Sequence, residues 1–329
     1  RFVAQNQSRI VFPFKRYEIG SVWRADRPQK GRLREFIQCD ADIIGDNSLW
    51  MEIDLLNLIQ TIFNRFKLDN LTIRVNNRKI LEGVFTSLNT LSLSFIEFCT
   101  IIDKIDKIGL EKAVDIFSQK GLLHQELLKI KTLLLLKGSW LEKKEYILKT
   151  FSSNEMLISG FNELSFILEK CGEKSNFQNI LFDISLARGL NYYTGCIFEV
   201  VSTKNQSISL AGGGRYDDLT SKFGLKNISG VGFSIGLDRL YLELESSNLF
   251  PLDIQNSLDV LFINFGLVES EHAQVYISEI RKSGISAELY PSNEKISKQM
   301  SYANKRLVKY VVMLGEEELR NDTLTVKDM

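Results

Sequence analysis

Residues 11–45 carry two stretches in which apolar and polar residues alternate, and a basic stretch lies between them. The first is FPFKRYEIGSVW (12–23), the basic stretch is RADRPQKGRLREF (24–36), and the second is FIQCDADIIG (36–45). Strict alternation is the pattern of a half-buried strand, because successive side chains point to opposite faces. The sequence therefore predicts a strand, a long basic loop and a second strand.

The following residues change to helical spacing. Residues 48–68 place apolar side chains at helical intervals, with Ser48 expected as the N-cap. LTIRV (71–75) predicts a strand, and a helix is expected near residues 78–90. Residues 91–180 lose the strand pattern, are rich in Leu, Lys and Glu, and contain no Pro. They predict a helical insertion.

Strand patterns with glycine punctuation return after the insertion. SSNLFPLDIQNS (246–257) then combines turn-forming and polar residues, as linkers do. Beyond it, strand and helix patterns alternate, which is typical of a small α/β domain. We therefore expect the following organisation: a core at 1–246 with the insertion at about 91–180, a linker at 247–256 and an α/β domain at 257–329.

Composition places this chain of 329 residues among ordinary globular proteins, with 44% hydrophobic and 25% charged residues. Lys plus Arg and Asp plus Glu are 41 each, so net charge favours neither nucleic acid nor membrane as a partner. No apolar run is long enough for a membrane-spanning helix, and the first residues do not resemble a signal peptide. Because the chain begins with Arg rather than Met, we expect a fragment.

The cysteines and histidines lack the spacing of a metal site. They are Cys39, Cys99, Cys171, Cys196, His124 and His272. Without a C-x-x-C pair, a structural zinc site is not expected. Widely spaced cysteines instead favour a reduced, cytosolic protein.

The predicted hairpin presents polar side chains that suit a ligand carrying both charges. Alternation places Gln38 and Asp42 in line on one face of the second strand, and Arg24 ends the first strand. An amide and a carboxylate beside an arginine can bind a molecule that has both a cation and an anion. For the basic stretch taken alone, a solvated hairpin tip is the alternative interpretation.

Tyrosines and glycines gather in two later stretches. LARGLNYYTGCIFEV (186–200) contains Arg188 and the pair Tyr192–Tyr193, ahead of an expected strand. AGGGRYDDL (211–219) has successive glycines followed by Tyr216. Glycines in a strand indicate that the backbone comes close to a ligand or to another strand.

A third stretch, GVGFSIGLDRLYLEL (230–244), predicts a strand that runs into a helix, with Arg239 in the first helical turn. A helix N-terminus favours an anion, and the planar guanidinium of arginine suits phosphate oxygens. Strand-packing glycines and surface ion pairs are the alternatives for each feature alone. The recurrence of Arg24, Arg188 and Arg239 beside tyrosines favours a phosphate-bearing ligand.

These motifs resemble a known family. Residues 14–45, FKRYEIGSVWRADRPQKGRLREFIQCDADIIG, resemble motif 2 of class II aminoacyl-tRNA synthetases in the form found in histidyl-tRNA synthetases. LARGLNYYTGCIFEV resembles that family's histidine-binding signature, and GVGFSIGLDRL resembles motif 3. The tail from residue 293 is similar to the anticodon-binding domain. The resemblance implies an α+β fold: a class II antiparallel sheet core with a helical insertion, plus a C-terminal α/β anticodon-binding domain.

The resemblance assigns four arginines to ATP and to catalysis. Arg24 would hold the α-phosphate and the histidine carboxylate and stabilise charge in the transition state. Arg32 would touch the ATP tail from the basic loop. Arg188 would lie near the α-phosphate, where other class II enzymes place a metal. Arg239 would bind the γ-phosphate or stack on adenine.

The same resemblance assigns the histidine pocket. Gln38 and Asp42 would receive the α-amino group, and Tyr193 and Tyr216 would surround the imidazole with Tyr192 beside them. The full expected histidine-binding set is Arg24, Gln38, Asp42, Arg188, Tyr192, Tyr193 and Tyr216.

The implied reaction activates L-histidine with ATP and Mg²⁺ to histidyl-adenylate and transfers the histidyl group to the 3′ end of tRNA(His). It needs no protein nucleophile, in agreement with the lack of a Ser-His-Asp arrangement. The resemblance also implies a cytoplasmic homodimer without a membrane partner or a protein-ligated metal. The alternative is a non-catalytic regulatory paralogue that senses histidine or tRNA. Because regulatory relatives tend to lose Arg24, Arg188, Tyr193 and Arg239, their presence favours the enzyme.

The sequence departs from the family pattern at several positions. Asn191 stands where the family usually has Asp, and Asp26 and Asp42 stand where Glu is common. The family also has, upstream of residue 1, a motif 1 helix and strand that build the dimer interface, and an acidic loop that recognises histidine. A last strand and helix follow in the family after the position of residue 329. We therefore expect the chain to be truncated at both ends.

One helix of the tail is expected to be amphipathic. Its apolar face would consist of Ile296, Met300, Ala303 and Leu307. The basic residues off that face are Lys298, Lys305 and Arg306. Such a face can contact RNA phosphates, and a solvated lysine face is the alternative.

Overall fold

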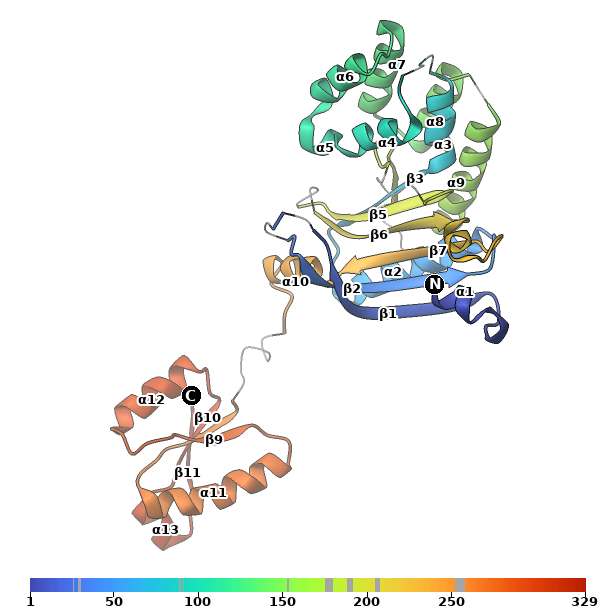
Figure 1. Ribbon diagram of the computed structural model, residues 1–329. Coiled ribbons are helices and arrows are strands. Elements are labelled where there is room, and N and C mark those ends of the chain that lie inside the picture. The colour runs from blue at the N-terminus through green and yellow to red at the C-terminus, as the bar shows by residue number, and fades with distance from the viewer. Residues whose placement is uncertain are drawn as a thin grey trace. The chain divides into compact units, whose positions relative to one another are not determined.

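The computed structural model describes two compact units of the chain, Arg1–Asn248 and Leu249–Met329 (Figure 1). The described residues are 1–25, 27–28, 31–88, 90, 92–152, 154–174, 180–187, 192–204, 208–251 and 258–329. None of the helices within these ranges is long and apolar enough to cross a membrane.

The first unit is built on a seven-stranded sheet. In spatial order its strands are β1 (Phe14–Trp23), β2 (Glu35–Ile44), β7 (Gly230–Gly236), β6 (Ser209–Tyr216), β5 (Cys196–Ser202), β3 (Leu71–Asn77) and β4 (Ile180–Phe182). Neighbouring strands are antiparallel except β3 and β4, which are parallel. The antiparallel core expected from the class II resemblance is therefore confirmed.

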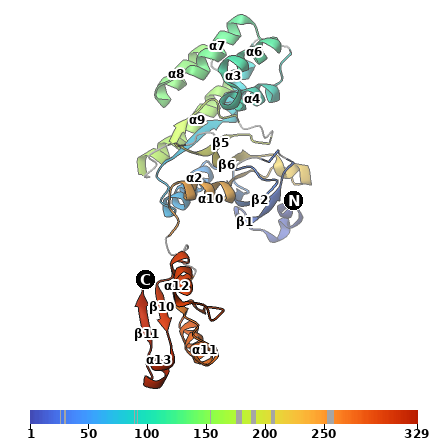
Figure 2. The same cartoon turned by 90° about the vertical axis from the view of Figure 1, so that its left-hand side faces the viewer.

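Helices surround this sheet. They are α1 (Phe2–Gln5), α2 (Trp50–Arg65), α3 (Arg78–Thr86), α4 (Phe95–Asp103), α5 (Ile105–Ile108), α6 (Leu110–Gln119), α7 (His124–Leu135), α8 (Trp140–Thr150), α9 (Glu155–Lys174) and α10 (Leu237–Ser246), with 3-10 turns at Gln7–Arg9 and Leu219–Phe223. α2 packs on α9 and β7, α9 also contacts β3 and β5, and α10 contacts β2, β6 and β7. Figure 2 shows α4, α6, α7 and α8 gathered beyond β5, away from β1.

α2 forms where the helical spacing predicts it, and Leu56 and Ile59 are fully buried beneath it. The expected cap is wrong by one residue, since Leu49 occupies the N-cap position and makes no side-chain cap bond. Ser48 lies one residue earlier, where its hydroxyl accepts a 3.3 Å hydrogen bond from the Trp50 N–H. The cap differs because the preceding turn is held by a buried arginine described below.

The described part of residues 91–180 is helical up to β4, as expected. Ser94 and Ser139 form capping boxes with Glu97 and Glu142 at the starts of α4 and α8, which fixes where these helices begin. The last helix, α9, packs against α3 and the sheet rather than only against its insertion neighbours.

The second unit is a small α/β domain. Its sheet has the order β11 (Thr325–Asp328), β10 (Tyr310–Met313), β8 (Val260–Phe262) and β9 (Ala287–Leu289), and its helices are α11 (Leu267–Lys282), α12 (Ile296–Lys305) and α13 (Glu316–Asn321). β10, β8 and β9 are parallel, and β11 is antiparallel to β10. Successive residues of β8 enter two separate apolar clusters, one with Ala303 of α12 and one with Ala273 of α11. Both faces of the sheet are therefore covered.

The expected apolar face of α12 is only partly correct. Ala303 is fully buried and Met300 packs against the core, but Ile296 and Leu307 are exposed. Leu307 lies beyond the last helical residue with a positive φ of 52°, so helical spacing no longer applies to it. The fully buried Gln299 takes a place on the inner face instead.

Candidate functional site

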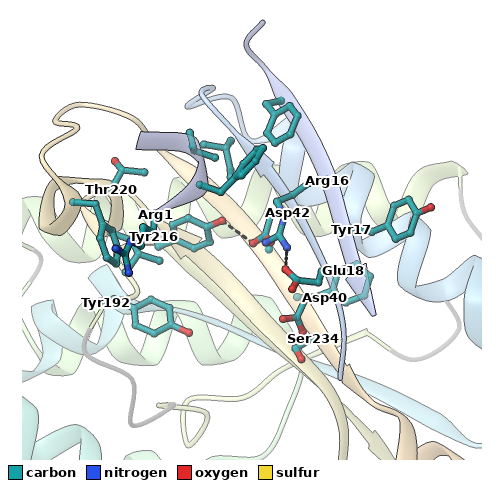
Figure 3. A pocket seen from close by; sticks show the side chains of 18 of the residues that line it. Arg1, Arg16, Tyr17, Glu18, Asp40, Asp42, Tyr192, Tyr216, Thr220 and Ser234 are labelled. Carbon is teal, nitrogen blue, oxygen red and sulfur yellow. Dashed lines mark hydrogen bonds and ion pairs between the residues drawn. The ribbon is translucent and has the colours of Figure 1, made fainter. Parts of the chain in front are cut away.

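A cavity of about 790 Å³ opens on the face of the sheet formed by β1, β2, β7 and β6 (Figure 3). Its polar lining includes Arg1, Arg16, Glu18, Asp40, Asp42, Tyr192, Tyr193, Tyr216, Thr220 and Ser234. The sequence-predicted residues Asp42, Tyr192, Tyr193 and Tyr216 thus meet in one place, although up to 174 residues separate them in the chain.

Strand register brings the charged lining residues together. Arg16 of β1 lies opposite Asp42 of β2, and Glu18 lies opposite Asp40. On the other side of β2, Asp40 pairs with Ser234. Because alternate residues point to one face of a sheet, these side chains all reach the cavity, as the alternation of the hairpin predicts.

Asp42 is the best-organised carboxylate in the cavity. Its Oδ1 accepts a 2.7 Å hydrogen bond from the Tyr216 hydroxyl, and its Oδ2 accepts a 3.1 Å bond from Arg16 Nη1. Burial raises the pKa of Asp42 even though Tyr216 and Arg16 both lower it. Burial and the neighbouring carboxylate also raise the pKa of Tyr216, which stays a neutral donor. A carboxylate in this state is stabilised by a further cation placed beside it.

Asp40 was not selected from the sequence, yet it lines the same cavity. Among the described residues its Oδ1 is buried without a hydrogen-bond partner. Its neighbour Glu18 pairs with Arg16, while Ser234 accepts a 2.6 Å hydrogen bond from the Gln38 side-chain amide. The cavity therefore presents more carboxylate than its own arginines neutralise, and a cationic ligand suits it.

Aromatic rings form another part of the wall. The Tyr192 and Tyr193 ring centroids are 4.5 Å apart, and Tyr192 meets Tyr216 edge-on at 6.3 Å. Gly214 allows this arrangement, because a Cβ there would lie 2.9 Å from the Tyr193 ring and 2.6 Å from the Cys196 carbonyl oxygen. The glycines thus permit close approach of a strand and a tyrosine, as expected.

Among the described residues, four that the sequence predicted do not line this cavity: Gln38, Arg24, Arg32 and Arg239. Gln38 is on the cavity face of β2 but its amide is bound to Ser234. It lies four positions before Asp42 in β2, about 13 Å away along the strand. Arg24 is exposed, and its guanidinium lies 5.1 Å above the Phe36 ring. Arg32 is half-buried on the connection between β1 and β2.

Arg239 ties this connection to the sheet. Its Nε donates to the Gly31 carbonyl at 2.9 Å, and its Nη1 donates to the Ser209 carbonyl at 2.8 Å. It lies in the first turn of α10, as predicted. Together with Arg24 and Arg32 it makes the far end of the hairpin basic, next to the acidic cavity. Arg188, and with it Asn191 and Asp26, lies outside the described residues.

The arrangement can hold a small zwitterion beside a polyanion. Within the described residues, no group of three or more His, Cys, Asp or Glu side chains is spaced to hold a metal ion. The signals for the missed lining residues were present in part. Arg16, Glu18 and Asp40 share the alternation of the predicted hairpin, whereas Ser234 and Thr220 carried no distinguishing pattern.

Comparisons with known proteins cover the whole chain. A sequence model described as Histidyl-tRNA synthetase matches residues 1–240, and one described as Anticodon binding domain matches residues 259–329. The chain is 47% identical over 331 residues to a Histidine--tRNA ligase of Christiangramia forsetii, covering all of this chain and 72% of the relative. It is 45% identical to that of Flavobacterium johnsoniae, covering 70% of the relative.

A solved structure gives the same result for the fold. The crystal structure of histidyl-tRNA synthetase from Nostoc sp. PCC 7120 superposes with a TM-score of 0.79 at 27% identity, over 99% of this chain and 76% of that one.

Proposed function

The chain belongs to the histidyl-tRNA synthetase family, and from this premise we propose how its residues carry out the family's reaction. It is an ATP-dependent ligase that activates histidine to histidyl-adenylate and attaches the histidyl group to tRNA(His). The observation that carries the assignment of the site is the cavity that joins Asp42 and Asp40 to three tyrosine rings. Histidine brings an ammonium group for the carboxylates and a flat imidazole for the rings.

The ammonium group of histidine binds at Asp42 in this proposal. Tyr216 and Arg16 hold the two oxygens of this carboxylate in place, and its raised pKa is relieved when a cation arrives. The imidazole lies among Tyr192, Tyr193 and Tyr216, whose ring faces and hydroxyls can pack on it and bind its nitrogens. Gln38 borders the carboxylate end of the bound amino acid.

ATP binds at the basic end of the hairpin. A histidine carboxylate oxygen attacks the α-phosphorus, the bond from that phosphorus to the bridging oxygen breaks, and pyrophosphate leaves with the electron pair. Arg24 and Arg188 are proposed to bind the α-phosphate and stabilise the negative charge that develops on it in the transition state. Arg32 contacts the distal phosphates. Arg239, held at Gly31 and Ser209, presents a fixed guanidinium to the adenine or the γ-phosphate.

Transfer then needs only positioning. A hydroxyl of the 3′-terminal ribose of tRNA attacks the carbonyl carbon of the adenylate, and AMP leaves. The basic connection at 24–36 is proposed to meet both the triphosphate and the acceptor end of the tRNA. The α/β domain at 257–329 is proposed to hold the anticodon, and the linker at 247–256 is proposed to join it to the core at 1–246.

ATP is proposed to enter as its Mg²⁺ complex, with the ion neutralising phosphate charge and travelling with the nucleotide. We assign the cavity carboxylates Asp40 and Asp42 to the ammonium group of histidine rather than to a resident metal.

We further propose a cytoplasmic homodimer. The outer strand β1 leaves Tyr17 80% and Ile19 63% exposed, and alternation places both on the face of the strand opposite Arg16 and Glu18. Apolar residues on an edge strand are suited to contact a second subunit. Sedimentation of the full-length protein should give the mass of a dimer, and a monomer at micromolar concentration would contradict this part.

The charging reaction tests the site assignment. Full-length protein, labelled histidine, ATP and purified tRNA(His) should yield acid-stable labelled tRNA. Asp42→Asn should raise the KM for histidine strongly while the KM for ATP changes little. Folded protein that binds histidine and tRNA but never charges tRNA would instead indicate a regulatory paralogue.

A further inference from the structure

A buried arginine lies directly behind the proposed histidine cavity. Arg215 is adjacent to Tyr216 in β6, so its side chain points to the opposite face of the sheet. It is 5% exposed, and its partner Glu52, in the first turn of α2, is 0% exposed. Neither residue lines the cavity.

Arg215 uses all five of its N–H groups. Its Nε donates to Glu52 Oε1 at 2.8 Å, and its Nη2 donates to Glu52 Oε2. The remaining protons go to the Asp46 carbonyl at 2.7 Å, the Ser48 carbonyl at 3.0 Å and the Ser229 hydroxyl at 2.7 Å. A lysine, with three protons at a single point, cannot make this set.

The network continues toward the tyrosines. Ser229 donates to Asp217 Oδ1 at 2.5 Å, and Thr194 donates to Asp217 Oδ2 at 2.6 Å. The Thr194 N–H donates to the Arg215 carbonyl at 2.9 Å. Thr194 directly follows Tyr193 in the chain, so the chain segment that carries Tyr192 and Tyr193 is tied to the arginine.

β6 therefore holds the end of β2 from both faces. On the cavity side Tyr216 binds Asp42 at 2.7 Å. On the opposite side Arg215 binds the carbonyls of Asp46 and Ser48, which lie in the turn directly after β2. A third tie is the 2.7 Å bond from the Gly45 N–H to the Ser229 carbonyl. The distance between Asp42 and the tyrosine rings thus depends on the hydrogen bonds of Arg215 on the opposite face of the sheet.

We propose that Arg215, with Glu52, is a positioning residue for the amino acid half of the reaction. It fixes the β2 end that carries Asp42 and the segment that carries the tyrosines in one relative position, without touching histidine or ATP itself. The proposal rests on the proposed function. Since Arg215 positions only the residues proposed to bind histidine, its loss should raise the KM for histidine and leave the KM for ATP nearly unchanged.

The test separates positioning from folding by a double variant. Removing one member of a buried ion pair leaves an uncompensated charge, whereas replacing both members by apolar residues of similar size is often neutral for stability. We therefore expect Glu52→Leu combined with Arg215→Met to fold, as judged by circular dichroism and thermal unfolding. Its KM for histidine should still rise by about tenfold or more, with the KM for ATP within about twofold of the parent.

Two conservative variants and a control complete the experiment. Arg215→Lys keeps the charge but not the five-proton fork, and should raise the KM for histidine. Glu52→Gln keeps an acceptor for Arg215 Nε but removes the charge that compensates the guanidinium, and should also raise the KM for histidine. Glu126→Gln, which changes another buried carboxylate in the insertion helix α7, should leave both KM values unchanged. If the double variant does not fold, Arg215→Lys decides.

The outcomes are distinct. A folded double variant, or Arg215→Lys, with the parent KM for histidine overturns the proposal, and so does an equal rise in the KM values for histidine and ATP. Parent protein that shows no histidine-dependent activity contradicts the proposed function instead, since that result appears before any variant is compared.

Discussion

Tyr216→Phe removes one hydroxyl from the histidine wall and leaves the ring in place. The hydroxyl donates to Asp42 Oδ1 at 2.7 Å, and the Tyr216 side chain is only 7% exposed. Asp42 keeps its 3.1 Å bond from Arg16, so it stays partly oriented, and the variant tests the tyrosine hydrogen bond alone.

The magnitude follows from the charge on the acceptor. A hydrogen bond to a charged group contributes about 1.5–3 kcal/mol net, which corresponds to about 10- to 150-fold in an equilibrium constant. We expect kcat/KM for histidine to fall within that range, mainly through KM. The KM for ATP should stay nearly constant, because Tyr216 lies in β6 and lines the histidine cavity.

The pH dependence gives a second, independent result. Tyr216 lowers the pKa of Asp42, so its hydroxyl opposes the rise caused by burial. Without the hydroxyl the pKa of Asp42 rises further, and Asp42 becomes protonated at a higher pH during acidification. Because kcat/KM reports the free enzyme, the acid limb of kcat/KM for histidine should shift to higher pH in the variant.

Histidine-dependent pyrophosphate exchange at varied histidine and varied ATP measures both effects. Tyr276→Phe, which removes a hydroxyl in α11 of the other unit, is the control and should match the parent. A Tyr216→Phe variant that folds with an unchanged KM for histidine and an unchanged acid limb would refute the role given to this hydrogen bond.

Three further changes test other parts of the site. Gly230→Ala places a Cβ 2.4 Å from Cε2 of Tyr216, so we expect about 1–3 kcal/mol of destabilisation from overpacking and a raised KM for histidine. Thermal unfolding measures the first effect and steady-state kinetics the second. An unchanged melting temperature would contradict the close packing of Gly230 against Tyr216. Asp40→Asn removes a carboxylate whose Oδ1 has no partner among the described residues; calorimetry should show weaker histidine binding without loss of stability, and unchanged affinity would exclude Asp40 from ammonium binding. Arg239→Lys loses the planar guanidinium that donates to the Gly31 and Ser209 carbonyls. The KM for ATP should rise about tenfold while the KM for histidine stays constant. A raised KM for histidine with an unchanged KM for ATP would instead place Arg239 on the histidine side.

Local pattern was enough to predict the hairpin and its cavity face. Alternation in 12–23 and 36–45 predicts two strands, which lie at Phe14–Trp23 and Glu35–Ile44. The same alternation places Gln38 and Asp42 on one face, and that face carries the cavity. Period and side-chain chemistry suffice here because a hairpin is made of neighbouring residues.

Long-range partners could not be predicted in the same way. Glu52 and Arg215 are separated by 163 residues, and nothing in either local pattern identifies the other as its partner. The same pair explains the misplaced cap of α2, since Arg215 binds the Ser48 carbonyl and fixes the turn before the helix. Leu307 was assigned to a helical face because the end of α12 at Lys305 carries no sequence signal.

The sequence resemblance assigns the ATP-side arginines to the phosphates and the adenine. Arg24 and Arg239 lie at the basic end of the hairpin, while Arg188 lies outside the described residues. An activity assay on a variant of one of these arginines therefore tests whether they take part in adenylate formation.

That measurement is the exchange of labelled pyrophosphate into ATP by the full-length protein, with Arg188→Ala alongside. We expect exchange that requires histidine, is not supported by other amino acids, and falls steeply in the variant. Folded protein that binds histidine but shows no exchange, or an Arg188→Ala variant as active as the parent, would contradict this expectation.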